Sequence, residues 1–294
     1  MSTQQTERFD ASGLDRWTET TRFEVQRERL IAYAEATNDP IPAHRAGDVA
    51  NPVFAIVPVF EALMAPALDV VPLGLFGRVV HGEQDFRFHR PIRPGDVLES
   101  RAKMTGFEGL PNGTRGTVYL ECRDAGSGEL VNEQHVTLFV RGFDTGEAVG
   151  TLGPEHRFDE ALRAHEPVLD RTAHVDEDQT FRYGPAAGDP MPIHLDEEVA
   201  RDAGLPGIIA HGLCTQAFTA WAIVQGLAGG DVARLRRLAV RFSKPVLPGQ
   251  DVRTRAWRAR HAPASDGPAT TTYAYETTVG EVAVIRDGLA EISD

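Results

Sequence analysis

The sequence predicts an α+β fold built from two tandem repeats, each a curved antiparallel sheet wrapped around a central helix. Residues 33–44 (YAEATNDPIPAH) match residues 183–194 (YGPAAGDPMPIH) at an offset of 150, and residues 87–95 match residues 241–249 at an offset of 154. Two matched blocks at nearly equal offsets indicate a duplicated unit. Each half also shows the same order of elements: a loop, an apolar helical segment and four strand-like runs.

In the first half, residues 1–20 are polar and are expected to be irregular, and residues 22–37 are expected to form a strand or helix leading into the loop that ends at His44. The apolar segment 54–70 is expected to be helical although Pro58 and Pro66 interrupt it. Alternating polar and apolar residues, separated by turn sequences, predict four strands. These strands are expected at 78–90, 97–106, 114–123 and 130–141.

A Gly-, Pro- and charge-rich stretch without a clear period, residues 142–170, is expected to be a connector. In the second half, residues 174–183 lead into the loop that ends at His194. A short acidic helix is expected at 195–204 and an amphipathic helix at 212–227. The remaining strands are expected at 235–243, 251–260, 270–278 and 282–292.

These elements divide the chain into an N-terminal repeat (1–145), a connector (146–170) and a C-terminal repeat (171–294). The helix of each repeat must bury its apolar stripe on one face of a sheet. The two sheets are expected to pair edge to edge, which also covers their exposed edges.

Composition narrows the classes of function. The formal net charge of −13 argues against nucleic acid and anionic membrane surfaces as partners. The chain has no apolar run of about 18 residues, so no membrane span is expected, and its polar start predicts no secretory leader. Two cysteines, Cys122 and Cys214, fit a reducing compartment and offer no metal framework. No glycine-rich loop follows a strand, which argues against a dehydrogenase.

Three segments resemble the hydratase 2 or MaoC-like family. They are residues 188–194 (GDPMPIH), 211–215 (HGLCT) and 241–249 (RFSKPVLPG). Residues 81–84 (HGEQ), followed by the turn at 90–95, are similar to the N-terminal half of the double hot-dog members. The resemblance covers roughly residues 25–292 and implies a double hot-dog fold and an (R)-specific enoyl-CoA hydratase.

The resemblance implies that Asp189 and His194 hold a reactive water and that the backbone N–H of Gly212 binds the thioester oxygen. Water addition to a trans-2-enoyl thioester needs a positioned water, a proton for C2 and stabilisation of the developing enolate. A helix that starts at Gly212 would add its positive end to that oxygen.

Further residues are expected to bind the substrate. These are Tyr183, Met191, His211, Arg241 and Lys244, the last two as possible partners of coenzyme A phosphates within a basic stretch that also holds Arg234, Arg236 and Arg237. Met191 stands where the family usually has Asn, and a thioether cannot make the hydrogen bonds of an amide.

Simpler interpretations exist for each residue. Asp189 precedes a proline and could be a turn residue. His211 could serve only to start the helix, Cys214 is expected to be a packed core residue, and the strand arginines could simply be solvated.

Asp39 and His44 repeat the acid–base pair, so a second active site is an alternative. Counting along the sequence aligns Pro58–Val59 with His211–Gly212, and Val59 would crowd the carbonyl. We therefore expect one active site, in the second repeat, with the first repeat shaping the acyl pocket.

The sequence thus predicts (R)-specific hydration of trans-2-enoyl-CoA to (3R)-3-hydroxyacyl-CoA, or the reverse dehydration. The alternatives are a hot-dog acyl-CoA thioesterase and a non-catalytic acyl-CoA-binding protein. No metal and no redox cofactor is expected, since coenzyme A is part of the substrate. We also expect a cytoplasmic homodimer.

Overall fold

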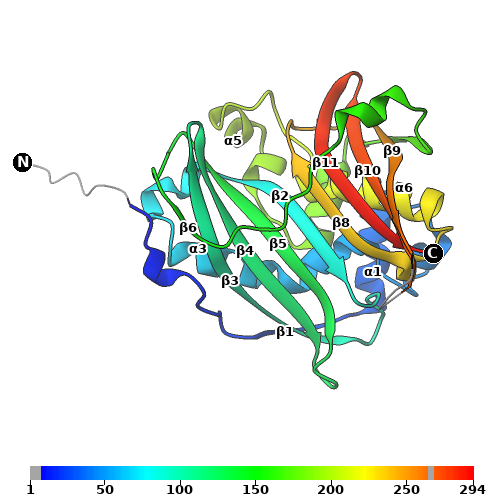
Figure 1. The fold of residues 1–294 in the computed structure, drawn as a ribbon, viewed down its shortest axis with the longest axis horizontal. Coiled ribbons are helices and arrows are strands. Elements are labelled where there is room, and N and C mark those ends of the chain that lie inside the picture. The colour runs from blue at the N-terminus through cyan, green and yellow to red at the C-terminus, as the bar shows by residue number, and fades with distance from the viewer. Residues whose placement is uncertain (1–7, 264–267) are drawn as a thin grey trace, which may run out of the picture.

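A single antiparallel sheet is the central element of the fold. The computed structural model describes residues 8–263 and 268–294, so the first seven residues of the predicted irregular lead-in lie outside it. The 11-stranded sheet has the order β1-β3-β4-β5-β2-β8-β11-β10-β9-β7, with β6 paired to β3. Figure 1 shows this sheet with α1, α3 and α6 behind it.

The first repeat supplies the first half of that order. Its strands are β1 (Thr21–Glu24), β2 (Val79–Phe88), β3 (Val97–Leu110), β4 (Gly113–Asp124), β5 (Leu130–Arg141) and β6 (Ala148–Gly150). Its helices are η1 (Ala11–Gly13), α1 (Arg27–Ala36), α2 (Pro42–Arg45), η2 (Pro52–Val59), α3 (Phe60–Leu68) and η3 (Leu73–Arg78). The four predicted strands are confirmed, and the segment left open as strand or helix contains both, β1 and then α1.

The second repeat follows the same plan after η4 (Glu160–Ala164). Its strands are β7 (Leu169–His174), β8 (Leu235–Phe242), β9 (Asp251–Ala262), β10 (Thr270–Val279) and β11 (Val282–Ser293). Its helices are α4 (Gln179–Ala187), η5 (Pro192–His194), α5 (Glu197–Asp202), α6 (Gly212–Leu227) and η6 (Val232–Arg234). The expected helix at 212–227 is confirmed at both ends. Among the described residues no helix has the length and apolar character to cross a membrane.

The two repeats join edge to edge through β2 and β8, as predicted. The antiparallel register runs from Glu83 opposite Arg241 to Arg87 opposite Arg237. Across this seam Arg237 donates from Nε and Nη2 to the Asp85 carboxylate, at distances of 2.7 to 3.1 Å. Both side chains are almost fully buried. A bidentate, buried pair of this kind fixes the register of the two halves.

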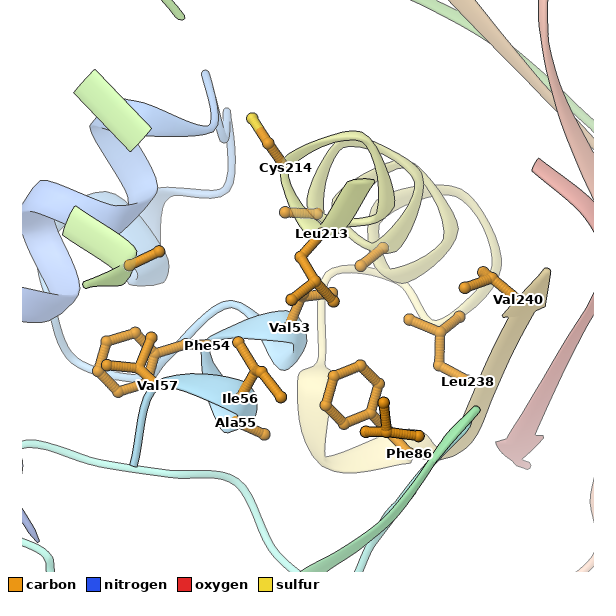
Figure 2. Packing of buried hydrophobic residues seen from close by; sticks show 14 of the residues in the cluster. Val53, Phe54, Ala55, Ile56, Val57, Phe86, Leu213, Cys214, Leu238 and Val240 are labelled. Atoms are coloured by element: carbon orange, nitrogen blue, oxygen red, sulfur yellow. The ribbon is translucent and has the colours of Figure 1, made fainter. Parts of the chain in front are cut away.

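Prolines make the central helices of the two repeats different. In α6 every residue from Leu213 to Val224 is buried, and no proline interrupts it. The first repeat begins its central segment at Pro52 and carries Pro58 and Pro66 inside it. Proline removes a backbone donor and distorts the helix, so this segment splits into the 3₁₀ helix η2 and the short α3. Figure 2 shows Val53–Val57 of η2 below Leu213 and Cys214 at the start of α6, with Phe86 and Leu238 of the joined sheet to their right.

Reciprocal hydrogen bonds relate α1 and α4 by an approximate twofold axis. Arg29 Nε donates to the Ala186 carbonyl at 2.8 Å, and Gln179 Nε2 donates to the Ala36 carbonyl at 2.5 Å. Each pair maps onto the other with the 150-residue offset seen in the sequence. At the axis the hydroxyls of Tyr33 and Tyr183 lie 3.2 Å apart. The repeats therefore pack as the two subunits of a symmetric dimer do.

One sequence alignment was wrong. The Ala50 N–H donates to the Ile92 carbonyl at 3.0 Å, and the Ala210 N–H donates to the Val246 carbonyl at 2.7 Å. Because Ile92 and Val246 are equivalent, Asn51 and Pro52 correspond to His211 and Gly212. Pro58 and Val59 lie further along η2. The error arose because the second repeat has an extra segment containing α5 between its loop and its central helix.

Candidate active site

Three side chains from separate elements of the second repeat converge at the start of α6. Asp189, His194 and His211 each have a ligand-type atom, and these atoms all lie within 4.8 Å of one another. Helix α4 ends at Ala187 and is followed by Gly188, whose left-handed conformation (φ 76°) turns the chain toward the cluster. The Asp189 carboxylate accepts the Met191 N–H at 3.1 Å, which closes a tight turn and brings η5 and His194 alongside.

The ring of His194 is held by the segment that is unique to this repeat. Its Nδ1 donates to the Ile209 carbonyl at 2.8 Å. A carbonyl can only accept, so Nδ1 carries the proton in the neutral ring and Nε2 presents a lone pair. His194 is buried, with 8% of its surface exposed. It can therefore accept a proton from a water that enters the cluster.

His211 supports this ring from behind. The two imidazoles stack with centroids 3.8 Å apart, and the Tyr183 ring lies 4.9 Å from the His211 ring on another side. Within the described residues neither ring nitrogen of His211 has a hydrogen-bond partner, although the residue is 1% exposed.

Burial determines the charge of the cluster. Removal from water raises the pKa of Asp189, against the opposing effects of the Met191 N–H and of His194. Burial lowers the pKa of His194, and burial together with the neighbouring His194 lowers the pKa of His211 to about 3. Both imidazoles are therefore neutral at neutral pH, and an acceptor nitrogen is available without prior deprotonation.

Gly212 presents the start of α6 to solvent. It is the first residue of the helix and is exposed, and in the described structure its N–H has no hydrogen-bond partner. A Cβ at this position would lie 3.3 Å from the ring of Phe242. The Cα of Gly212 therefore packs closely against this ring, and its N–H lies at the positive end of a 16-residue helix.

The corresponding groups of the first repeat are closed. Asp39 Oδ2 accepts from His44 Nδ1 at 2.7 Å and from Asn51 Nδ2 at 2.8 Å, while Oδ1 accepts the Ile41 N–H at 2.9 Å. The side chains of Asp39 and His44 are 0% exposed. Pro52, in the place of Gly212, has no N–H at all. His44 Nε2 has no partner among the described residues, but it is fully buried, and this copy has no backbone donor at the start of its central helix.

The loop length explains the difference between the histidines. Only seven positions separate His44 from Asn51, whereas 17 separate His194 from His211, with α5 between them. The longer segment carries the Ile209 carbonyl to His194 Nδ1 and draws the ring away from Asp189. In the short segment the histidine bonds its own aspartate instead.

Only two of the five predicted substrate-binding residues belong to the cluster. His211 and Tyr183 belong to the cluster, but the Tyr183 hydroxyl is buried against Tyr33. Met191 lies in the loop with 50% of its surface exposed, and Lys244 is exposed just after β8. Arg241 lies next to Phe242 in the strand, so it projects from the opposite face of the sheet.

On that face Arg241 lies 3.9 Å from Glu83 and 3.8 Å from Asp287. Arg237 likewise forms a buried ion pair with Asp85. The buried Arg237 is therefore unavailable for a phosphate contact, whereas a role for the exposed Arg241 stays a prediction. A role for Lys244 stays a prediction.

Three groups close to the cluster or to Gly212 could not be identified from the sequence pattern. The Ile209 carbonyl has no side-chain signal, and Phe242 resembled any strand residue. His81 stacks edge-on against Phe242 with centroids 5.2 Å apart, and its Nε2 is buried without a partner in the described structure. The segment HGEQ was a signal for His81, but it could not place that residue across the seam from the second repeat.

Comparison with known proteins agrees with this geometry. Residues 160–280 match the MaoC like domain, and residues 14–127 match the FAS1-like dehydratase domain region. The chain is 31% identical over 210 residues to 3-hydroxyacyl-thioester dehydratase Y of Mycobacterium tuberculosis, which covers 69% of this chain and 71% of that protein. The chain belongs to the MaoC-like dehydratase family. This MaoC-like protein is also 30% identical over 215 residues to the peroxisomal multifunctional enzyme type 2 of Mus musculus, which covers 70% of the chain but only 28% of the mouse protein.

Solved structures confirm the fold. A MaoC-like dehydratase from Phytophthora capsici superposes with a TM-score of 0.78 at 23% identity, covering 96% of each chain. A Mycobacterium tuberculosis protein described as having a double hotdog fold gives a TM-score of 0.61 at 11% identity, covering 95% of each chain. The predicted double hot-dog architecture is thus confirmed.

Proposed function

We propose that this MaoC-like protein adds water across the double bond of a trans-2-enoyl-CoA to give the (3R)-3-hydroxyacyl-CoA, and catalyses the reverse dehydration. One observation carries the proposal. In the second repeat an Asp189 oxygen, His194 Nε2 and the Gly212 N–H are all open, whereas in the first repeat both Asp39 oxygens accept hydrogen bonds, the His44 side chain is fully buried and Pro52 has no N–H. The names of the relatives, enoyl-CoA hydratase 2 and 3-hydroxyacyl-thioester dehydratase, support the same reaction.

The reaction can be written with the groups present. Asp189 accepts a hydrogen bond from the water and orients it, while His194 Nε2 takes its other proton as oxygen bonds to C3. The electron pair of the double bond moves toward the thioester oxygen, where the Gly212 N–H stabilises the developing enolate. The imidazolium of His194 then gives its proton to C2, so the net change is one water added and the enzyme is regenerated.

Absorbance of the enoyl thioester tests this assignment. Wild-type protein should consume trans-2-enoyl-CoA, and the product should be the (3R) alcohol by chiral analysis. Release of free thiol in place of hydration would favour the thioesterase, and tight binding without turnover in either direction would favour a binding protein. An (S) product would contradict the family mechanism.

The finer details remain part of this proposal. The first repeat is the non-catalytic unit that shapes the acyl pocket, since its Asp39–His44 pair is sealed. The active form is a homodimer in the cytoplasm that uses no cofactor, as expected from the sequence, with mass measurement in solution and localisation of the tagged protein as tests.

A further inference from the structure

The stacked pair of imidazoles distinguishes the second repeat from the first. The rings of His211 and His194 lie with centroids 3.8 Å apart and with their planes inclined by 28°. At the position of His211 the first repeat has Asn51, whose Nδ2 donates to Asp39 Oδ2 at 2.8 Å. We infer that His211 is a positioning residue of the proposed hydratase, on which this inference rests: it holds the His194 ring by stacking and leaves the Asp189 carboxylate open for water.

The His211 ring acts through its faces. The residue is 1% exposed, and in the described structure both ring nitrogens are buried without a hydrogen-bond partner. Burial and the neighbouring His194 lower the pKa of His211 to about 3, so the ring is uncharged at neutral pH. An uncharged ring with buried nitrogens offers the substrate no polar contact, so this role differs from the substrate binding expected from the sequence.

A column of aromatic rings fixes the position of His211. On another side its ring lies 4.9 Å from that of Tyr183, which lies 5.5 Å from that of Tyr33. The two tyrosine hydroxyls meet at the axis between the repeats, and both residues are buried. Aromatic pairs favour particular orientations. The column therefore sets the plane of the His194 ring, whose side chain makes one hydrogen bond in the described structure, to the Ile209 carbonyl.

The first repeat shows what a donor at this position does to the acid–base pair. The backbone angles of Asn51 (φ −55°, ψ 139°) and His211 (φ −59°, ψ 134°) are nearly the same. Asn51 Nδ2 and His44 Nδ1 both donate to Asp39 Oδ2, which uses that oxygen. Asp189, in contrast, accepts one hydrogen bond through Oδ1, and its Oδ2 stays open. A side chain that stacks without donating therefore keeps this carboxylate available.

Asp189 supplies the charge that acts on the stacked rings. Burial lowers the pKa of His194, and the Ile209 carbonyl and the Asp189 charge act in the opposite direction. The Tyr183 hydroxyl and the nearby Cys214 thiol are uncharged, because burial raises the pKa of each. A change that favours the ionised form of Asp189 should therefore raise the pKa of His194.

The test compares His211→Asn, His211→Phe and His211→Leu in the full-length protein. NMR titration without substrate follows the His194 imidazole, whose signals are assigned by their loss in His194→Gln. Asn can donate to Asp189 as Asn51 donates to Asp39, which favours the ionised carboxylate, so the pKa of His194 should be higher in His211→Asn than in wild type. Phe and Leu cannot donate, so neither variant should show this rise.

Turnover gives a second readout. In His211→Asn, kcat should fall by about 100-fold or more, the loss typical of disabled acid–base catalysis, because Asp189 no longer accepts from water. His211→Leu, without a ring face, should have a kcat roughly 2- to 10-fold below that of His211→Phe, the factor that corresponds to one aromatic pair. His174→Gln, at an exposed site, is the control and should match wild type in kcat and in the pKa of His194.

Thermal melting checks the folding of each variant. An unchanged or lower pKa of His194 in folded His211→Asn, or an equal rise in His211→Leu, would overturn the role at Asp189. Equal kcat values in folded His211→Phe and His211→Leu would overturn the stacking role, and if the larger Phe ring prevents folding, the contrast in pKa between Asn and Leu still tests the inference. Because the titration needs no substrate, a wild-type protein that is inactive toward trans-2-enoyl-CoA would reject the proposed reaction and leave the positioning result interpretable.

Discussion

Exchanging Gly212 for the proline found at the equivalent position of the first repeat isolates the oxyanion donor. Gly212 is the first residue of α6, a position where proline is tolerated because its missing N–H has no intrahelical partner. The preceding residue also fits, since His211 has φ −59° and ψ 134°, within the extended region that proline requires of its neighbour. Asn51 before Pro52 has nearly the same angles, −55° and 139°.

Gly212→Pro should therefore fold and lose one hydrogen bond to the enolate. Loss of one such donor typically costs about 3–4 kcal/mol, or roughly a 100- to 1,000-fold decrease in kcat. Gly212→Ala is the control, because it adds the same Cβ at 3.3 Å from Phe242 but keeps the N–H. Initial rates with trans-2-enoyl-CoA measure both variants, and thermal melting checks folding.

Comparable losses of kcat in both variants would show that crowding under Phe242, and not the hydrogen bond, is responsible. Full activity of a folded Gly212→Pro protein would refute the oxyanion role altogether.

Three further predictions follow from burial. Asp189→Asn should abolish hydration while leaving the melting temperature nearly unchanged. Asp39→Asn breaks a fully buried pair and should cost about 3–5 kcal/mol of stability, but kcat per folded molecule should be retained. Equal losses of kcat in the two variants would reject a single active site. Burial lowers the pKa of His81 to about 4, below the value of about 6.5 in the unfolded chain. The stability of the fold with His81 neutral is therefore complete above pH 6.5 and is lost as the pH falls toward 4, by roughly 3 kcal/mol. A denaturation series over this range should show less pH dependence of the unfolding free energy in His81→Gln than in wild type. Identical pH dependence in the two proteins would contradict this. Tyr183→Phe leaves the Tyr33 hydroxyl buried without its partner and should cost about 1–3 kcal/mol, and the double Phe variant should be less destabilised than the sum of the single variants in urea unfolding.

Much of the fold could be predicted because its signals are local. Alternation along β3 matches its alternating burial, whereas β4 and β5 are buried over most of both faces, and the turn sequences between the strands mark their ends. The limits of α6 were readable because Gly212 opens a long apolar segment and Gly229–Gly230 follows its end. The edge-to-edge pairing of the two sheets followed from the repeat, but the strands that form the seam, β2 and β8, are known from the structure alone.

The site was only partly predictable because its decisive contacts are not local. The sequence identified Asp189, His194 and Gly212 by resemblance, and the structure brings them together around α6. It could not show that His44 bonds Asp39 whereas His194 bonds the Ile209 carbonyl. That difference depends on the path of the backbone between loop and helix, where side-chain identity carries little information. For the same reason sequence counting placed Val59 where Pro52 belongs.

The covalent tether between the repeats has a consequence for how such a protein can change. In a symmetric dimer of identical chains, each substitution occurs on both sides of the axis, so a proline at the helix start would destroy both catalytic centres at once. Here Arg29 and Gln179 maintain the twofold contact, while Pro52 and Gly212 differ. With the single active site proposed above, substitutions in the first repeat could change the shape of the shared core without altering the groups around Gly212.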